Sequence, residues 1–139
     1  MIKICGLGTS CQSTRKARQW FKAQEIPFEF RDISHDPLSI EEIQHILCLT
    51  EYGTEDIIST RTEIYEELDL DIDSLSLTAL YEYIQKYPRL LRYPLIFNDD
   101  KLQVGFNKHD IRKFIPREER KRDFWQMFQA YQKLQNEGI

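Results

Sequence analysis

The sequence predicts a mixed α/β fold in a single domain. Hydrophobic patterns with the two-residue period of strands and with the longer period of helices alternate along the chain, and 139 residues suffice for one compact core. The composition, with 41% hydrophobic and 30% charged residues, is typical of a globular protein. Disordered, collagen-like and coiled-coil classes do not fit this composition.

The first 33 residues predict a strand-helix-strand unit. Apolar and polar side chains alternate over 2–7 and again over 28–33, which is the period of strands. Between them, apolar residues recur at three- and four-residue spacing from 12 to about 26, which predicts an amphipathic helix. A connection of this length implies parallel pairing with a right-handed crossover.

Residues 34–88 predict a series of helices. Ser39 followed by Glu42 forms a capping box, the start signal of a helix expected over about 40–48. Pro88 stops the last helix of the series. The other segments expected here are a short turn at 55–59, a helix around 64–68 and a helix from 77 that Ser76 caps.

The next segment predicts a β-hairpin, with strands at 95–97 and 102–106, and a short helix that Asn107 can cap. The complete order of elements is that of a thioredoxin-like sheet with a helical insertion between its second and third strands. We expect a single domain, 1–139, made of a thioredoxin-like lobe (about 1–33 and 89–116), a helical insert (about 34–88) and a C-terminal helical tail (about 117–139).

Aromatic residues in the tail are spaced for one face of a helix. Phe124, Phe128, Tyr131 and Leu134 recur at helical intervals, with Trp125 beside them. Packing of this face on the body of the protein is the expected arrangement. Dimerisation and recognition by a protease are the alternatives.

Charge is segregated along the chain. The formal net charge is +4 over 1–31, −12 over 32–100, +5 over 101–122 and −1 over the remainder, which totals −4. An acidic middle between basic flanks indicates either a solvated helical insert or a surface that meets a charged partner.

Nothing in the sequence indicates export or a membrane span. No apolar run approaches the roughly 20 residues of a membrane helix, and residues 1–8 lack the features of a signal peptide. Cys5, Cys11 and Cys48 are too few for a secreted disulfide framework. We expect a cytoplasmic protein without membrane partners and without a cofactor. No metal is expected either, because cysteines and histidines show no paired-ligand spacing.

Cys11 is the candidate for thiol chemistry. It lies between the first predicted strand and helix, where free N–H groups and the helix dipole favour a thiolate, and Arg15 adds a positive charge one turn later. A reactive thiol is the prediction, and an inert helix cap is the alternative. Thr14 stands where a C-x-x-C pair has its second sulfur, so Cys11 cannot form a disulfide within the motif.

Six segments together resemble the Spx regulators, thioredoxin-fold relatives of the glutaredoxin-linked arsenate reductases. They are S-C-Q-S-T-R-K-A-R from Ser10, P-L-S-I-E-E-I from Pro37, T-E-Y-G-T-E-D-I-I-S-T-R from Thr50, L-L-R-Y-P from Leu90, L-Q-V-G-F-N from Leu102 and I-R-K-F-I-P from Ile111. The resemblance covers about residues 1 to 120 and implies an arsenate reductase-like fold. It also implies a cytoplasmic regulator of the thiol or oxidative stress response that binds the C-terminal domain of the RNA polymerase α subunit.

The resemblance also assigns residues. Gly53, with Thr54 beside it, matches the α-subunit-binding surface, where the lack of a side chain permits close approach. At the thiol, the resemblance assigns the first redox cysteine to Cys11 and the arginine that follows it to Arg15. It also matches Arg61 to a basic residue near the sulfur and Pro94 to the proline that the fold holds in cis.

Two positions depart from the family pattern. Thr14 removes the second cysteine of the usual disulfide switch, which leaves Cys11 to form a mixed disulfide with a low-molecular-weight thiol or to sense nothing. Tyr93 replaces the arginine that Spx proteins and the reductases place before the proline. The second change weakens any oxyanion site there.

Two classes of function follow from the resemblance. In the first class, the protein is a binding module that docks on RNA polymerase. Two interpretations are then open for Arg112, Lys113 and Arg117: they lie near promoter DNA in that complex, or they belong to a solvated helix end. A Clp-type protease is a further expected partner. As an enzyme, it is a monothiol arsenate reductase in which Cys11 attacks arsenate and glutathione or glutaredoxin resolves the adduct. The regulator is preferred, because only Arg61 matches one of the three arginines that the enzyme needs.

Overall fold

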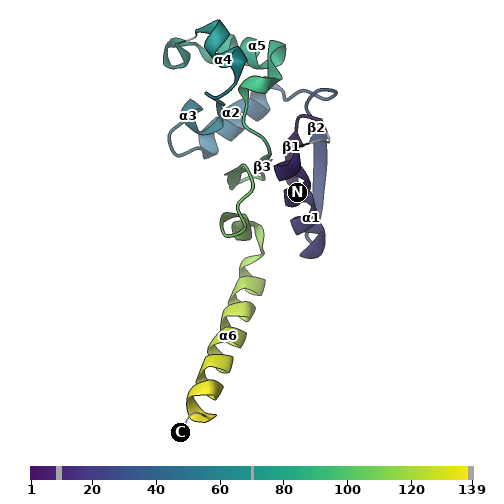
Figure 1. Cartoon of the computed structure of the whole chain (residues 1–139), viewed down its shortest axis with the longest axis vertical. Coiled ribbons are helices and arrows are strands. Elements are labelled where there is room, and N and C mark those ends of the chain that lie inside the picture. The colour runs from purple at the N-terminus through teal and green to yellow at the C-terminus, as the bar shows by residue number, and fades with distance from the viewer. Residues whose placement is uncertain (9–10, 70, 138–139) are drawn as a thin grey trace.

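The computed structural model describes residues 1–8, 11–69 and 71–137, without the side chains at 117, 120, 123 and 137. Helices and strands follow in the order expected from the sequence (Figure 1). The elements are β1 (Ile2–Gly6), α1 (Gln12–Ala23), β2 (Phe28–Asp32), α2 (Ile40–Leu49), α3 (Thr54–Ile57), α4 (Glu63–Leu68), η1 (Ile72–Ser74), α5 (Leu77–Lys86), η2 (Pro88–Leu90), β3 (Leu95–Phe97), β4 (Leu102–Val104), η3 (Asp110–Phe114) and α6 (Arg117–Glu137).

The four strands form one sheet in the order β2-β1-β3-β4. β1 pairs in parallel with β2, which places Ile4 opposite Phe30, and antiparallel with β3, which places Ile4 opposite Ile96. β3 and β4 form the antiparallel hairpin. The predicted fold class, a thioredoxin-like sheet with helices between its second and third strands, is confirmed.

Helices pack against both faces of the sheet. Successive residues of a strand point to opposite sides, so the strands contribute side chains to a buried cluster on each face. On one face, Ile4 and Ile96 pack with Phe21 of α1 and Phe114 of η3. The other face carries the larger cluster, which joins the sheet to the inserted helices through Cys5, Leu95, Phe97, Ile43, Ile46, Ile57, Leu80 and Ile84. The thioredoxin-like lobe and the insert therefore share a buried core.

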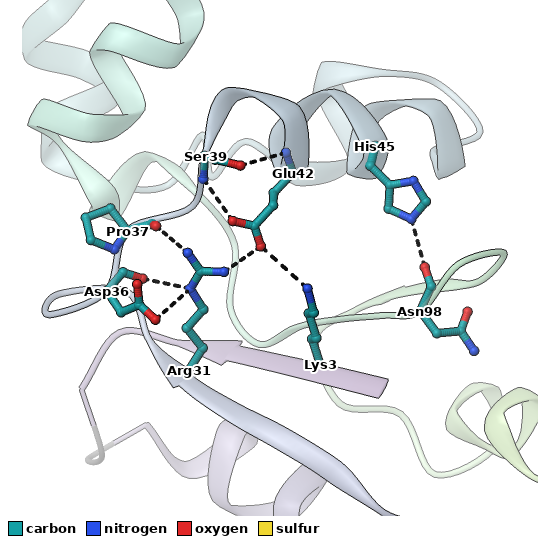
Figure 2. Close-up of polar contacts among 8 residues, drawn as sticks. All are labelled: Lys3, Arg31, Asp36, Pro37, Ser39, Glu42, His45 and Asn98. Carbon is teal, nitrogen blue, oxygen red and sulfur yellow. Dashed lines mark hydrogen bonds and ion pairs between the residues drawn. The ribbon is translucent and has the colours of Figure 1, made fainter. Parts of the chain in front are cut away.

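The capping box of α2 also joins this helix to the sheet. Ser39 Oγ accepts from the Glu42 N–H at 3.1 Å, and Glu42 Oε1 accepts from the Ser39 N–H at 3.1 Å. Glu42 Oε2 pairs with the Arg31 guanidinium on β2 and lies 3.9 Å from Lys3 Nζ on β1 (Figure 2). Burial opposes the charged carboxylate, but hydrogen bonds from Ser39 and Arg31 outweigh it and lower the pKa of Glu42.

Two elements differ in detail from the prediction. α3 is a four-residue helix that begins at Thr54, one residue before the turn expected at 55–59. Residues 110–114 form a 3₁₀ helix. The N-cap residue of this helix is His109 and not the expected Asn107, whose Oδ1 accepts from the N–H groups of His109 and Asp110 in the turn just before it.

The expectation that the tail packs on the body is wrong. α6 runs away from the rest of the molecule (Figure 1), and Trp125 and Tyr131 are 59% and 60% exposed. Helical spacing shows which residues share a face, but it does not show what covers that face. In the described part of the chain, no helix is long and apolar enough to cross a membrane.

Candidate functional site

Cys11 is the N-cap residue of α1, in extended backbone (φ −67°, ψ 121°). Burial of the thiol opposes ionisation. The pKa of Cys11 nevertheless lies below its ordinary value, because other groups favour the thiolate more strongly than burial disfavours it. These groups are the Thr14 hydroxyl, the backbone N–H groups of Thr14 and Ser13, and the charge of Arg15. The position predicted from the sequence therefore has the electrostatics of a helix N-terminus.

Thr14 is part of the core and not of the surface. Its side chain is 1% exposed, and a Cβ placed on Gly6 would lie 2.8 Å from Thr14 Cγ2. Gly6 of β1 therefore makes room for the Thr14 methyl group. The place of a second motif cysteine is filled by a packed side chain with no redox chemistry.

The other two thiols are separate from this site. Cys5 is fully buried in β1, and burial raises its pKa to about 12, so it serves as a small core residue. Cys48 is exposed at the end of α2.

Cys11 opens into a cavity of about 620 Å³ that three arginines line. Arg61 follows α3, and Arg89 and Arg92 come from η2 and the segment after it. The complete lining is Leu7, Cys11, Ser59, Thr60, Arg61, Thr62, Arg89, Leu91, Arg92, Tyr93, Val104 and Gly105. The lining therefore combines one thiol with three positively charged side chains, although Arg15, which is not part of the lining, is the charge that acts on the Cys11 pKa.

Three hydrogen bonds fix the wall of the cavity. The Arg92 backbone N–H donates to the Ile57 carbonyl at 2.8 Å, and Arg92 Nε donates to the Ile58 carbonyl at 3.1 Å. Tyr93 Oη donates to the Pro88 carbonyl at 2.7 Å, and burial raises the pKa of this phenol. The segment before β3 is thereby bonded to the end of α3.

The predicted thiol-site residues are only partly brought together. Cys11 and Arg61 line the same cavity, Arg15 is exposed on α1, and the Tyr93–Pro94 peptide bond is cis. Neither Arg89 nor Arg92 was among the residues predicted from the sequence. Their position just before the expected cis-proline was the signal that could have indicated them.

Gly53 lies in a turn that its neighbours hold firmly. The Gly53 N–H donates to Thr50 Oγ1 at 3.0 Å, and the N–H groups of Glu51 and Tyr52 donate to Asp56 Oδ2 at 2.9 and 3.0 Å. The backbone of Gly53 (φ +82°, ψ −134°) is one that residues with a side chain rarely adopt. A Cβ there would meet no atom within 4 Å, so the glycine faces open space.

The basic residues near η3 are used differently from one another. Arg112 is exposed. Lys113 Nζ donates to the Leu102 carbonyl at 2.6 Å, and burial lowers its pKa. The side chain of Arg117 lies outside the described part of the structure. Lys113 therefore joins η3 to β4, and of the two described side chains Arg112 is the exposed one.

The fold and the cysteine before α1 define a thioredoxin-like protein. The model of the ArsC family matches residues 8–114. The chain is 50% identical to the global transcriptional regulator Spx of Enterococcus faecalis over 80% of this chain and 84% of that protein. It is 49% identical to the Spx of Bacillus subtilis, over 80% and 85%. The chain therefore belongs to the ArsC family, on the branch of the Spx regulators.

Solved structures agree on the fold. An ArsC-family-related protein from Bacteroides fragilis superposes with a TM-score of 0.68 at 20% identity, covering 81% of this chain and 95% of that one. The arsenate reductase from Vibrio cholerae gives a TM-score of 0.61 at 21% identity, covering 81% and 92%. At these identities the likeness concerns architecture and carries no activity.

Proposed function

We propose that this protein is a cytoplasmic transcriptional regulator that binds the C-terminal domain of the RNA polymerase α subunit in a thiol or oxidative stress response. The observation that carries the proposal is 49–50% identity, over 84–85% of their length, to relatives named global transcriptional regulator Spx. The protein acts in this role by binding and not by turnover.

The turn at Gly53 supplies a docking surface. It is rigid, it is open at the glycine, and Thr54 next to it begins α3. The surrounding segment 32–100 carries a net charge of −12, which would steer a basic partner surface toward it. A rigid surface loses little conformational entropy on binding.

Docking would then be independent of the redox state. Cys11 has no second motif sulfur, because Thr14 is packed against Gly6. A disulfide within the motif is chemically impossible, so dithiothreitol has no disulfide of that kind to reduce. Promoter DNA would meet the protein only within the polymerase complex, with Arg112 as its outward cation.

Calorimetry with the purified C-terminal domain of the α subunit tests the proposal. We expect a dissociation constant of about 1 μM or tighter, unchanged by dithiothreitol. Gly53→Arg should weaken binding by at least about tenfold, because its side chain projects into the partner. Absence of binding by the unmodified protein in either redox state would reject the proposal.

Gly53→Ala is the matched control. Alanine carries the same backbone strain as arginine at a φ of +82°, but it adds a single methyl group. The difference between the two variants therefore isolates the steric effect. If both lose binding equally, backbone strain and not contact with the partner is responsible, and circular dichroism will show whether the turn region has unfolded.

A second candidate function has one observation in its favour. The cavity at Cys11 holds Arg61, Arg89 and Arg92, although Tyr93 occupies the place of an expected arginine. A thiol with a lowered pKa that lines the same cavity as three arginines suits a thiolate that attacks an oxyanion such as arsenate. Attack would form an S–As bond and release one arsenate oxygen as water. A glutathione thiol would then attack Cys11 Sγ, so that arsenite leaves with the electron pair of the S–As bond and a Cys11–glutathione disulfide remains for glutaredoxin to reduce.

Arsenite production decides this second candidate. The protein is incubated with arsenate, glutathione and glutaredoxin, and arsenite is quantified against Cys11→Ser. Turnover that depends on Cys11 would add an enzymatic role. Equal background rates for both proteins would remove it.

A further inference from the structure

α6 carries an apolar face that no other part of the described structure covers. Its large hydrophobic side chains are exposed by 41–71%, among the largest exposures of hydrophobic residues in the described chain. They are Phe124, Trp125, Met127, Phe128, Tyr131 and Leu134. The rings of Trp125 and Phe128 pack edge to face with centroids 5.9 Å apart.

The body of the same molecule cannot cover this face. Ile115 is buried in the body, and Pro116 alone separates it from the first residue of α6. Through this short link, α6 is directed away from the body (Figure 1). Since each residue adds about 1.5 Å, Phe124 already lies about 10 Å along the helix and Leu134 about 15 Å further. The face needs another molecule.

The pattern of the face suits a second copy of this helix. Phe124, Met127, Tyr131 and Leu134 follow a 3-4-3 spacing, which is the a/d spacing of paired helices. Residues 124–132 contain no charged side chain. Two identical segments therefore meet without like-charge repulsion, whereas a charged partner would find nothing to pair with.

We propose that two copies of this protein associate through α6 in an antiparallel, twofold-symmetric pair. In a register centred on residue 129, Phe124 lies opposite Leu134 of the second copy, and Met127 lies opposite its Tyr131. Each layer thus joins an a position to a d position, as antiparallel pairing requires, and sets a ring against an aliphatic chain. A parallel pair would force the two bodies together, because helices pair at about 8–10 Å.

The size of the face fits a specific and reversible contact. From their exposed fractions, the six side chains offer on the order of 700 Å² per copy, close to the roughly 800 Å² per partner of a standard interface. The twofold symmetry makes each residue contribute twice. A small dimer interface without charged pairs is expected to depend on concentration and little on salt.

Sedimentation velocity and light scattering of the full chain test the proposal. We expect the mass to rise from monomer to dimer between about 1 and 100 μM. The double variant Phe124→Gln with Leu134→Gln removes both members of the two symmetry-related outer layers and should weaken association by at least about tenfold. Glutamine preserves helix propensity, and circular dichroism verifies that α6 remains helical.

Gln126→Ala with Gln129→Ala is the matched control, because both residues lie on the opposite face of α6 and are exposed. This variant should dimerise like the unmodified protein. A monomer at all concentrations would overturn the proposal and assign the face to a different protein. A dimer that the Phe124 and Leu134 substitutions leave intact, or that the control also loses, would overturn it as well.

Discussion

Cys5 and Cys11 show how position separates two thiols six residues apart. Burial in β1 raises the pKa of Cys5 to about 12, so this thiol stays protonated at physiological pH. At the N-terminus of α1, Thr14, Ser13 and Arg15 favour the thiolate of Cys11 despite partial burial. Only the second thiol is ready to react.

The reactivity of Cys11 gives a pH-dependent prediction. In a Cys48→Ser background, the rate of alkylation by iodoacetamide should reach half its maximum at a pH below the ordinary thiol value of about 8.5. The sign follows from the lowered pKa, since the thiolate persists to lower pH. Arg15→Gln should move the midpoint upward, because it removes a stabilising charge.

Lys16→Gln is the control for this measurement, because Lys16 is also exposed on α1 but is not among the charges that lower the pKa of Cys11. Its midpoint should match that of the parent. An equal shift from both substitutions would mean that overall charge acts, and not the Arg15 side chain.

Site residues that belong to one short segment could be predicted from the sequence, whereas those that reach the same cavity from distant segments could not. The sequence indicates Cys11 and Arg15 because both belong to one helix start. Arg89 and Arg92 reach the same cavity only because η2 and the end of α3 are bonded to each other. That convergence depends on tertiary contacts between residues more than 30 positions apart, which no short motif records.

The N-terminus of α2 makes a contribution to stability that can be measured. Glu42 closes the capping box and pairs with Arg31, so Glu42→Gln should lower the free energy of unfolding by about 1–2 kcal/mol at pH 7. Because the folded-state pKa of Glu42 is lowered, its stabilisation is complete above the unfolded pKa of about 4.3 and is lost as pH falls through the folded pKa.

Urea denaturation at pH 7 and at about pH 3 measures this difference, which should shrink at the lower pH. Glu41→Gln is the control, since Glu41 occupies the same first turn but is exposed and lies outside the capping box. Equal destabilisation by the two substitutions would assign the effect to the helix dipole.

Helices differ in how far their contacts are made by residues close to them in the sequence. The capping box of α2 was predictable because Ser39 and Glu42 satisfy each other within four residues. The spacing in α6 predicts a helix equally well, and that helix is present. The prediction that α6 packs on the body is wrong, because such packing depends on the direction that the chain takes after Pro116, which the spacing of residues within the helix does not determine.

For the whole molecule, we propose one cooperative unit that comprises the thioredoxin-like lobe (1–33 and 89–116) and the helical insert (34–88), with the tail 117–139 attached. Both buried clusters of the described residues are built without α6. Truncation after Pro116 should therefore leave the free energy of unfolding within about 0.5 kcal/mol in dilute solution, measured by urea titration. A loss above about 2 kcal/mol would place the tail inside the unit.

The direction of α6 also governs how the protein moves through solution. Its 21 residues extend about 32 Å, close to the diameter of about 35 Å expected for a compact body of this size. A particle of that shape (Figure 1) has a larger Stokes radius than a sphere of equal mass. A column calibrated with spherical standards will assign the monomer too high a mass, so elution volume alone cannot count the copies in solution.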